Sequence, residues 1–159
     1  MKVQGNIRFL CQGAAIAGLY AALTLALLPI SFGAGGAFQF RAAEALTLLP
    51  VLSPAAVPGL FVGCLLANCL CGAPLPDIVF GSLATLLAAL LTRKAQKNLY
   101  LAALMPVLCN TAVVGAMLSA VYGLPLPYAC LTVMPGEAAA CFLLGIPLCR
   151  GLNRLNLFR

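Results

Sequence analysis

Residues 99–121 read LYLAALMPVLCNTAVVGAMLSAV, and this stretch decides the fold class. It contains no charged residue, and as a helix rising ~1.5 Å per residue it is long enough to cross the ~30 Å hydrocarbon core of a bilayer. A helix that is apolar on every side needs lipid or other helices around it. We therefore interpret residues 99–121 as a transmembrane helix.

The rest of the chain has the same character. Hydrophobic residues make up 64% of the 159 residues and charged residues 8%, whereas a soluble domain carries roughly 25% charged residues. At ~20 residues per crossing the length allows about six crossings. The expected spans are residues 9–30, 42–52, 55–71, 76–92, 99–121 and 128–149. The sequence thus predicts an all-α, polytopic membrane helix bundle with about six transmembrane helices in one domain, residues 1–159.

Three of these spans have features of their own. The span 9–30 is longer than the ~7–15-residue apolar region of a signal peptide, so we expect it to be retained as a helix. The span 42–52 is short, is bounded by Pro50 and Pro54, and could form a re-entrant hairpin with 55–71. The span 128–149 contains Pro135, at which we expect the helix to bend or to begin late.

The basic residues fix the orientation. With an even number of crossings, eight of the nine fall on one side, which the positive-inside rule makes the cytoplasm. These eight are Lys2, Arg8, Arg93, Lys94, Lys97, Arg150, Arg154 and Arg159. We expect both termini in the cytoplasm and the protein in the bacterial plasma membrane. Because the basic residues fall at span ends and do not form a patch with aromatic residues, we expect no nucleic-acid partner.

The three carboxylates lie elsewhere. Glu137 is about ten residues into the last span, near the bilayer centre, and Asn110 is about as deep in its own span. A charge at the centre costs on the order of 2.5–3.5 kcal/mol on insertion scales, so such a residue usually faces a cavity or the bundle interior. We interpret Glu137 as a ligand contact in an outward-opening pocket. The alternatives are a structural glutamate for Glu137 and an interhelical hydrogen bond for Asn110.

Four further polar residues belong to the outer half of the expected bundle. Glu44 and Asp77 begin spans at the outer face, where they can contact a ligand or simply favour a helix start. Asn68 lies near the outer end of its span, and Arg41 is the one basic residue on the outer side. Pairing with Glu44 is the simplest account of Arg41.

The loop 31–40 combines glycines with aromatic rings. Phe38 and Phe40 could stack on a flat ligand as part of a lid over the pocket. An ordinary interfacial loop with anchoring aromatics is the alternative.

Small residues form stripes on the first span. They are Ala14, Gly18 and Ala22 in one register and Ala17 and Ala21 in another. Such stripes let a second helix approach closely, either within the bundle or from a partner protein.

Motifs for catalysis and for energy conversion are missing. The chain has no GxxxxGK[ST] nucleotide loop and no histidine, and no serine or cysteine has a candidate activating base. The eight cysteines form no CxxC pair, so a zinc site lacks its usual ligands. We expect neither an enzyme nor a cofactor or metal site, and any pumping must draw energy from other proteins.

The middle of the chain resembles a known family. Residues 38–50, FQFRAAEALTLLP, are similar to the Q-x-R-x-x-E-A-L-x-x-L-P stretch of the QueT family, and residues 54–68, 77–90, 110–115 and the pair Gly136-Glu137 resemble its other segments. Cys109 is a departure, because the family pattern leads us to expect an aromatic residue there.

This resemblance implies a function. QueT proteins are substrate-binding (S) components of energy-coupling factor (ECF) transporters, and they capture deazaguanine precursors of queuosine, prequeuosine bases or queuine, from outside. Their partners are a transmembrane coupling subunit and two ABC-type ATPases. The family's docking role for small residues on the first helix falls here on Ala17 and Ala21, with Ala14, Gly18 and Ala22 as the other register.

The implied ligand suits the polar residues. A deazaguanine presents an N–H and an amino group side by side, which a carboxylate can accept together. We assign Glu137 and Asn110 to the base edge and Glu44 or Asp77 to an aminomethyl ammonium group. Alternative functions are an S component for another vitamin-like ligand, such as a pteridine or thiamine, a self-sufficient proton-coupled carrier using Glu137, and a purely structural membrane subunit.

Overall fold

Every element in the described part of the chain is a helix. The computed structural model describes residues 2–27 and 41–155, with side chains from residue 5 onward. The elements are α1 (Lys2–Ala26), η1 (Ala42–Val51), α3 (Ala56–Leu70), η2 (Asp77–Gly81), α4 (Ser82–Lys94), α5 (Leu99–Tyr122), α6 (Leu126–Ala138), η3 (Ala139–Gly145) and α7 (Ile146–Arg154). The π-helical turns η2 and η3 lead directly into α4 and α7, so residues 2–27 and 41–155 form six helical segments. This confirms the prediction of an all-α helix bundle.

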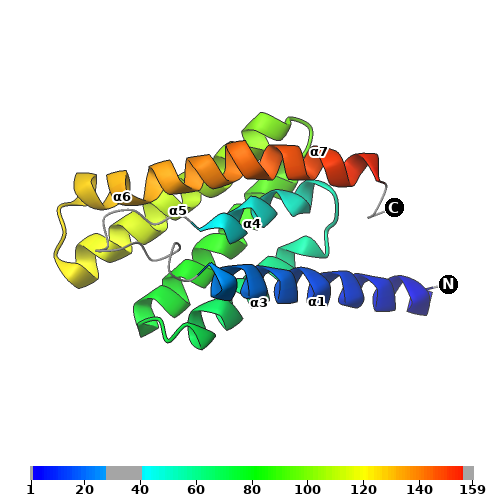
Figure 1. The fold of residues 1–159 in the computed structure, drawn as a ribbon, viewed down its shortest axis with the longest axis horizontal. Coiled ribbons are helices and arrows are strands. Elements are labelled where there is room, and N and C mark those ends of the chain that lie inside the picture. Colours follow the sequence, from blue (N-terminus) through cyan, green and yellow to red (C-terminus); the bar gives the residue numbers. More distant parts are fainter. Residues whose placement is uncertain (1, 28–40, 156–159) are drawn as a thin grey trace.

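The bundle is apolar outside, and its apolar interior also holds several buried polar side chains. Among the described residues, three helices are long and apolar enough to cross a membrane, Gly5–Ala26, Leu99–Tyr122 and Leu126–Arg154. Large apolar side chains cover the outside, among them Leu19, Leu66, Leu87, Leu108, Leu131 and Leu143, whereas the buried polar side chains include Thr24, Glu44, Thr47, Asn68, Thr85, Thr92, Asn110, Thr132 and Glu137. Exposed apolar surface on this scale requires a lipid environment. The first turns of α1 and the last turn of α7 lie at the same end of the bundle (Figure 1).

The ends of α5 have local causes. The Asn98 side chain accepts hydrogen bonds from the backbone N–H groups of Tyr100 at 3.1 Å and Leu101 at 3.3 Å, which satisfies two donors at the helix start. Gly123 follows the last turn with a φ of 67°, a left-handed conformation that favours glycine. These two residues confine α5 to nearly the span expected from its apolar run.

The last helix and the short segment 42–52 can each be compared with the expectation. The last helix does not begin late at Pro135: it begins at Leu126 and continues through the proline, because neighbouring helices compensate for the one hydrogen bond that a proline removes. The segment 42–52 is the 3₁₀-helix η1, which at ~2.0 Å per residue is about 20 Å long and too short to cross alone. Residues 43–50 are all buried, so η1 lies inside the bundle.

A glycine seam joins α1 to α3, the helix pair with the most extensive contact. It is formed by Gly13 and Ala17 on α1 with Gly59 and Gly63 on α3. A Cβ atom on Gly59 would lie 2.7 Å from the Gly13 carbonyl oxygen, and one on Gly63 would lie 2.9 Å from the Ala17 carbonyl oxygen. The two backbones therefore meet directly, as in membrane helix pairs that associate through small residues.

A polar cavity between η1, α4, α5 and α6

Four of the helical segments enclose one small polar cavity. Its volume is ≈ 10 Å³, room for about one water molecule. The lining residues are Arg41, Glu44, Gly81, Thr85, Asn110, Val114, Val133 and Glu137. They come from the start of η1, from η2 and α4, from α5 and from α6, so the packing of distant segments creates the site. We call it the acceptor cavity because three of its lining residues carry buried acceptor oxygens without a partner among the described residues.

Glu44 enters the cavity from the first turn of η1. It is 1% exposed, and its Oε1 accepts a hydrogen bond of 2.5 Å from the hydroxyl of Tyr20 on α1. Its Oε2 is buried and has no hydrogen-bond partner among the described residues. One oxygen of this carboxylate is thus held by Tyr20, and the other has no hydrogen-bond partner among the described residues.

Asn110 and Glu137 face Glu44 from α5 and α6. Both are buried, and the Asn110 side-chain amide interacts with the carboxylates of Glu44 and Glu137. Two further oxygens, Oδ1 of Asn110 and Oε2 of Glu137, are buried without a hydrogen-bond partner in the described part of the chain. Asn110 therefore links the two carboxylates through its amide group, while its carbonyl oxygen stays without a partner among the described residues.

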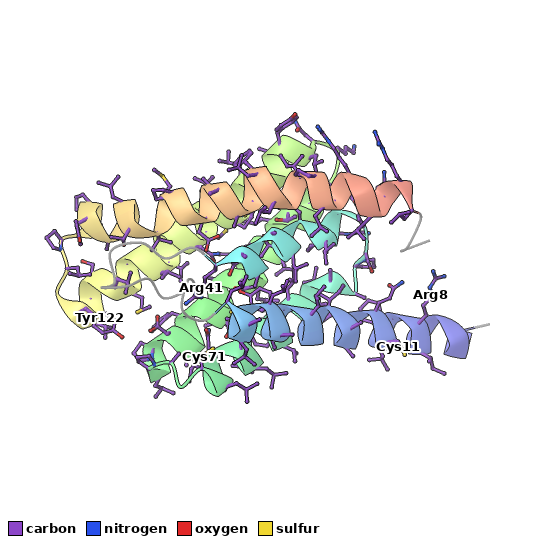
Figure 2. The ribbon with its side chains drawn as sticks, viewed as in Figure 1. Arg8, Cys11, Arg41, Cys71 and Tyr122 are labelled. Carbon is purple, nitrogen blue, oxygen red and sulfur yellow. The ribbon has the colours of Figure 1, made fainter. Side chains whose placement is uncertain are left out.

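Arg41 supplies the positive charge of the cavity. It precedes η1, and its guanidinium interacts favourably with the carboxylates of Glu44 and Glu137. Figure 2 shows Arg41 in the half of the bundle that also holds Cys71 and Tyr122, away from Arg8 at the other end. Two carboxylates and one guanidinium leave the lining with one carboxylate in excess.

Three orphaned oxygens in one cavity define its chemistry. A buried polar atom without a partner costs on the order of 1–3 kcal/mol, and native proteins keep few of them. Here all three are acceptors, contributed by Glu44, Asn110 and Glu137. A molecule with several N–H donors, one of them positively charged, would satisfy them.

The structure separates the predicted site residues into three groups. Arg41, Glu44, Asn110 and Glu137 line the cavity. Asp77 does not: it is half-buried at the start of η2 and interacts with the hydroxyl of Tyr122. The third group is Asn68, Phe38 and Phe40: Asn68 does not line the cavity, and the two phenylalanines lie outside the described residues.

Asn68 is buried beside the cavity without lining it. Its amide donates to the Asp77 backbone oxygen at 3.3 Å and to the Cys64 sulfur at 3.6 Å, so it ties α3 to η2. Phe38 and Phe40 lie outside the described residues, and their role as a lid stays a prediction.

Two polar residues of the site were missed from the sequence. Tyr20 and Thr85 are both buried, and Thr85 donates to the Gly81 backbone oxygen at 3.0 Å and to the Cys64 sulfur at 3.4 Å. Each is a hydroxyl side chain in the middle of an apolar span, the same signal that identified Asn110. Tyrosine and threonine are common enough in membrane helices that this signal alone does not single them out.

The two stripes on α1 have different surroundings. Ala17 and Ala21 are 5% and 8% exposed and lie inside the bundle, Ala17 within the glycine seam. Ala14, Gly18 and Ala22 are exposed on the outer surface of α1. The register first assigned to docking, Ala17 and Ala21, is therefore covered by the protein's own helices, because the narrow seam brings α3 onto that face.

Fold and site together describe an α-helical membrane protein whose helices enclose a polar site. The family model described as QueT transporter matches residues 10–154. The chain belongs to this family, and is accordingly a membrane transporter protein for a small-molecule ligand. No curated protein and no solved structure matched the chain.

Proposed function

We propose that this chain is the substrate-binding component of an ECF-type importer and that it captures a deazaguanine queuosine precursor from outside the cell. The observation that carries the proposal is the set of three orphaned acceptor oxygens around the acceptor cavity. A deazaguanine offers the matching donors: a ring N–H and an amino group on one edge, and an ammonium group in the aminomethyl form.

Each donor has a partner in this scheme. The ring N–H and the amino group bind the Glu137 carboxylate side by side, a charge-assisted bidentate contact. The ammonium group binds Oε2 of Glu44, and its positive charge balances the negative charge of the second carboxylate in the lining. Asn110 Oδ1 accepts a hydrogen bond from another N–H group of the ligand. The Asn110 NH₂ group can donate to the ligand carbonyl only if the side chain rotates away from the two carboxylates.

Binding requires the cavity to widen. A cavity of ≈ 10 Å³ cannot hold a bicyclic base, since ligand pockets typically measure ~300–1,000 Å³. The π-helical turns are placed to allow this: η2 contains the lining residue Gly81, and η3 begins two residues after Glu137. Such turns occur frequently at functional sites.

Energy for uptake comes from partners in this proposal. The sequence has no nucleotide-binding motif, so a coupling subunit and two ABC-type ATPases drive the import. The exposed stripe Ala14, Gly18 and Ala22 is the docking surface. As one multi-pass domain of the cell membrane with cytoplasmic termini, the chain presents its basic end to the ATPases.

A ligand panel tests the proposal. The purified chain is screened by thermal shift and calorimetry against the prequeuosine bases, queuine, a pteridine and thiamine, and co-purifying small molecules and proteins are identified by mass spectrometry. We expect stabilisation by a deazaguanine, strongest for the aminomethyl form. Stabilisation by thiamine or the pteridine alone would overturn the assignment of the ligand.

The docking surface has a separate test. Gly18→Leu places a large side chain on the exposed stripe, where a Cβ atom meets nothing within 4 Å in the isolated chain. We expect this variant to keep its ligand and to lose co-purification of the coupling subunit. Unchanged co-purification would exclude the stripe as the docking surface.

A second function is favoured by one observation. Glu44 and Glu137 are buried carboxylates that share the Asn110 amide, an arrangement that could pass a proton in a self-sufficient carrier. Uptake into liposomes that contain only this chain, driven by a pH gradient, would support that function. The importer proposal expects no uptake without the ATPases.

A further inference from the structure

One hydrogen bond connects α1 to the acceptor cavity. The Tyr20 hydroxyl donates to Glu44 Oε1 at 2.5 Å, across 24 positions of sequence. Both residues are 1% exposed, so water does not compete for this bond. Tyr20 does not line the cavity itself. In this structure the contact of Tyr20 with the cavity lining is its hydrogen bond to Glu44.

The glycine seam fixes the position of this hydroxyl. A Cβ atom on Gly63 would lie 2.9 Å from the Tyr20 Cβ atom, so the tyrosine stands where α3 has no side chain. On the opposite surface of α1, Gly18 and Ala22 are exposed. A movement of α1 against α3 would carry the tyrosine hydroxyl with it and change its bond to Glu44.

We propose that Tyr20 is a positioning residue that orients the Glu44 carboxylate toward a cationic group of the ligand and so couples the ligand site to the placement of α1. The bond occupies Oε1 of a residue that lines the cavity and leaves its Oε2 without a hydrogen-bond partner among the described residues. Without it the carboxylate is free to turn toward Arg41 or Asn110, which both interact with Glu44. The identity of the ligand rests on the proposed function, but the link between Tyr20 and Glu44 does not.

This role makes a specific prediction about ligand choice. A ligand with an ammonium group uses Glu44, whereas the same base without that group does not. Removal of the Tyr20 hydroxyl should weaken binding of the charged ligand far more than that of the neutral one. A tyrosine that only fills space would weaken both alike.

The experiment is a double-mutant cycle with two ligands. Dissociation constants are measured for 7-aminomethyl-7-deazaguanine and for 7-deazaguanine with the wild type, Tyr20→Phe, Glu44→Gln and the double variant. Tyr20→Phe is expected to raise the constant about 10-fold for the aminomethyl ligand and less than about 3-fold for the neutral one. In the Glu44→Gln background it should change neither by more than about 2-fold, because the residue it acts through is already altered.

Thr24→Val is the matched control. Thr24 is a buried hydroxyl residue on the same helix, and it donates to the Tyr20 backbone oxygen at 2.9 Å without contacting Glu44. It should leave the ratio of the two constants unchanged. Equal losses for both ligands in Tyr20→Phe, or effects that simply add to those of Glu44→Gln, would overturn the proposal.

A ligand-free measurement separates this inference from the proposed function. If the wild type binds neither deazaguanine, the proposed ligand is wrong, and the melting temperatures of the same four proteins decide the link. Non-additive melting temperatures would support a direct bond between Tyr20 and Glu44 in the resting protein. Additive ones would refute it.

Discussion

The glycine seam and the acceptor cavity of this bundle differ in how well their atoms are packed and paired. In the seam, Gly59 and Gly63 let two backbones touch. In the cavity, side chains from four segments surround a space in which three acceptor oxygens lack partners. The seam therefore contributes stability, and the cavity costs stability in the absence of a ligand.

The difference follows from the lipid environment. Lipid tails are as apolar as leucine, so helices gain little from burying leucine against each other and associate through close van der Waals packing instead. A buried acceptor without a partner is unfavourable in the same environment, because no water reaches it. A site that binds a polar ligand therefore lowers the stability of the ligand-free protein. The close packing of the nearby seam offsets this loss.

The largest effect is expected from breaking the seam. Gly63→Leu places a side chain where even a Cβ atom lies 2.9 Å from the Ala17 oxygen and the Tyr20 Cβ atom. The backbone of α3 would have to move away from α1, which we expect to lower the free energy of unfolding by at least about 3 kcal/mol. The melting temperature and the elution profile in detergent measure this loss.

Gly18→Leu is the control for that prediction. It introduces the same side chain on α1 at a position with no atom within 4 Å of a Cβ. Its melting temperature should match that of the wild type. Equal losses in the two variants would show that the seam has no special part in stability.

The next largest effect concerns the cavity. Glu137→Gln keeps the shape of the side chain but replaces one acceptor by a donor, so the paired N–H groups of the ligand lose a partner. We expect weaker binding by about 2–3 kcal/mol, roughly a 30- to 150-fold higher dissociation constant. Calorimetry with the aminomethyl ligand measures it.

Asp77→Asn sharpens this result. It is the same chemical change at a carboxylate outside the cavity, beside Tyr122. The dissociation constant should change less than about 3-fold. A loss as large as that of Glu137→Gln would place Asp77 in the ligand site and require the cavity to extend from Gly81 to the first residue of η2.

How far the sequence predicts this molecule depends on what decides each feature. The span 99–121 matches α5, Leu99–Tyr122, because its apolar run, the cap Asn98 and the glycine at 123 are all local. Glu137 and Asn110 were identified because a deep polar residue in an apolar span is conspicuous wherever its neighbours lie. Features that depend on a single helix could thus be predicted from the sequence.

Features that depend on how neighbouring helices pack could not be predicted from the sequence. Which stripe of α1 is exposed depends on where α3 packs, and only the structure shows Ala17 inside and Gly18 outside. The partner of Tyr20 lies 24 residues away on η1, and no periodicity in the sequence connects the two. The 3₁₀ geometry of η1, a segment buried over residues 43–50, was likewise not predicted from the sequence.

The smallest predicted effect concerns the anchoring of η1, which carries Glu44 at its other end. The last carbonyls of a helix lack partners within it, and here the Arg93 guanidinium at the end of α4 donates to the Pro50 oxygen at 2.8 Å and to the Val51 oxygen at 3.4 Å. Arg93→Gln should lower stability by on the order of 1 kcal/mol, since the arginine is only half-buried. This corresponds to about 2–4 °C in melting temperature.

Lys94→Gln removes the same charge one residue later from an exposed side chain, and its melting temperature should stay within about 1 °C of the wild type. Ligand affinity should change less than about 3-fold in Arg93→Gln, because Glu44 is held at the opposite end of η1 by Tyr20. A large loss of affinity would mean that η1 moves as one rigid unit and that the cavity, unlike the seam, depends on contacts at both ends of this short helix.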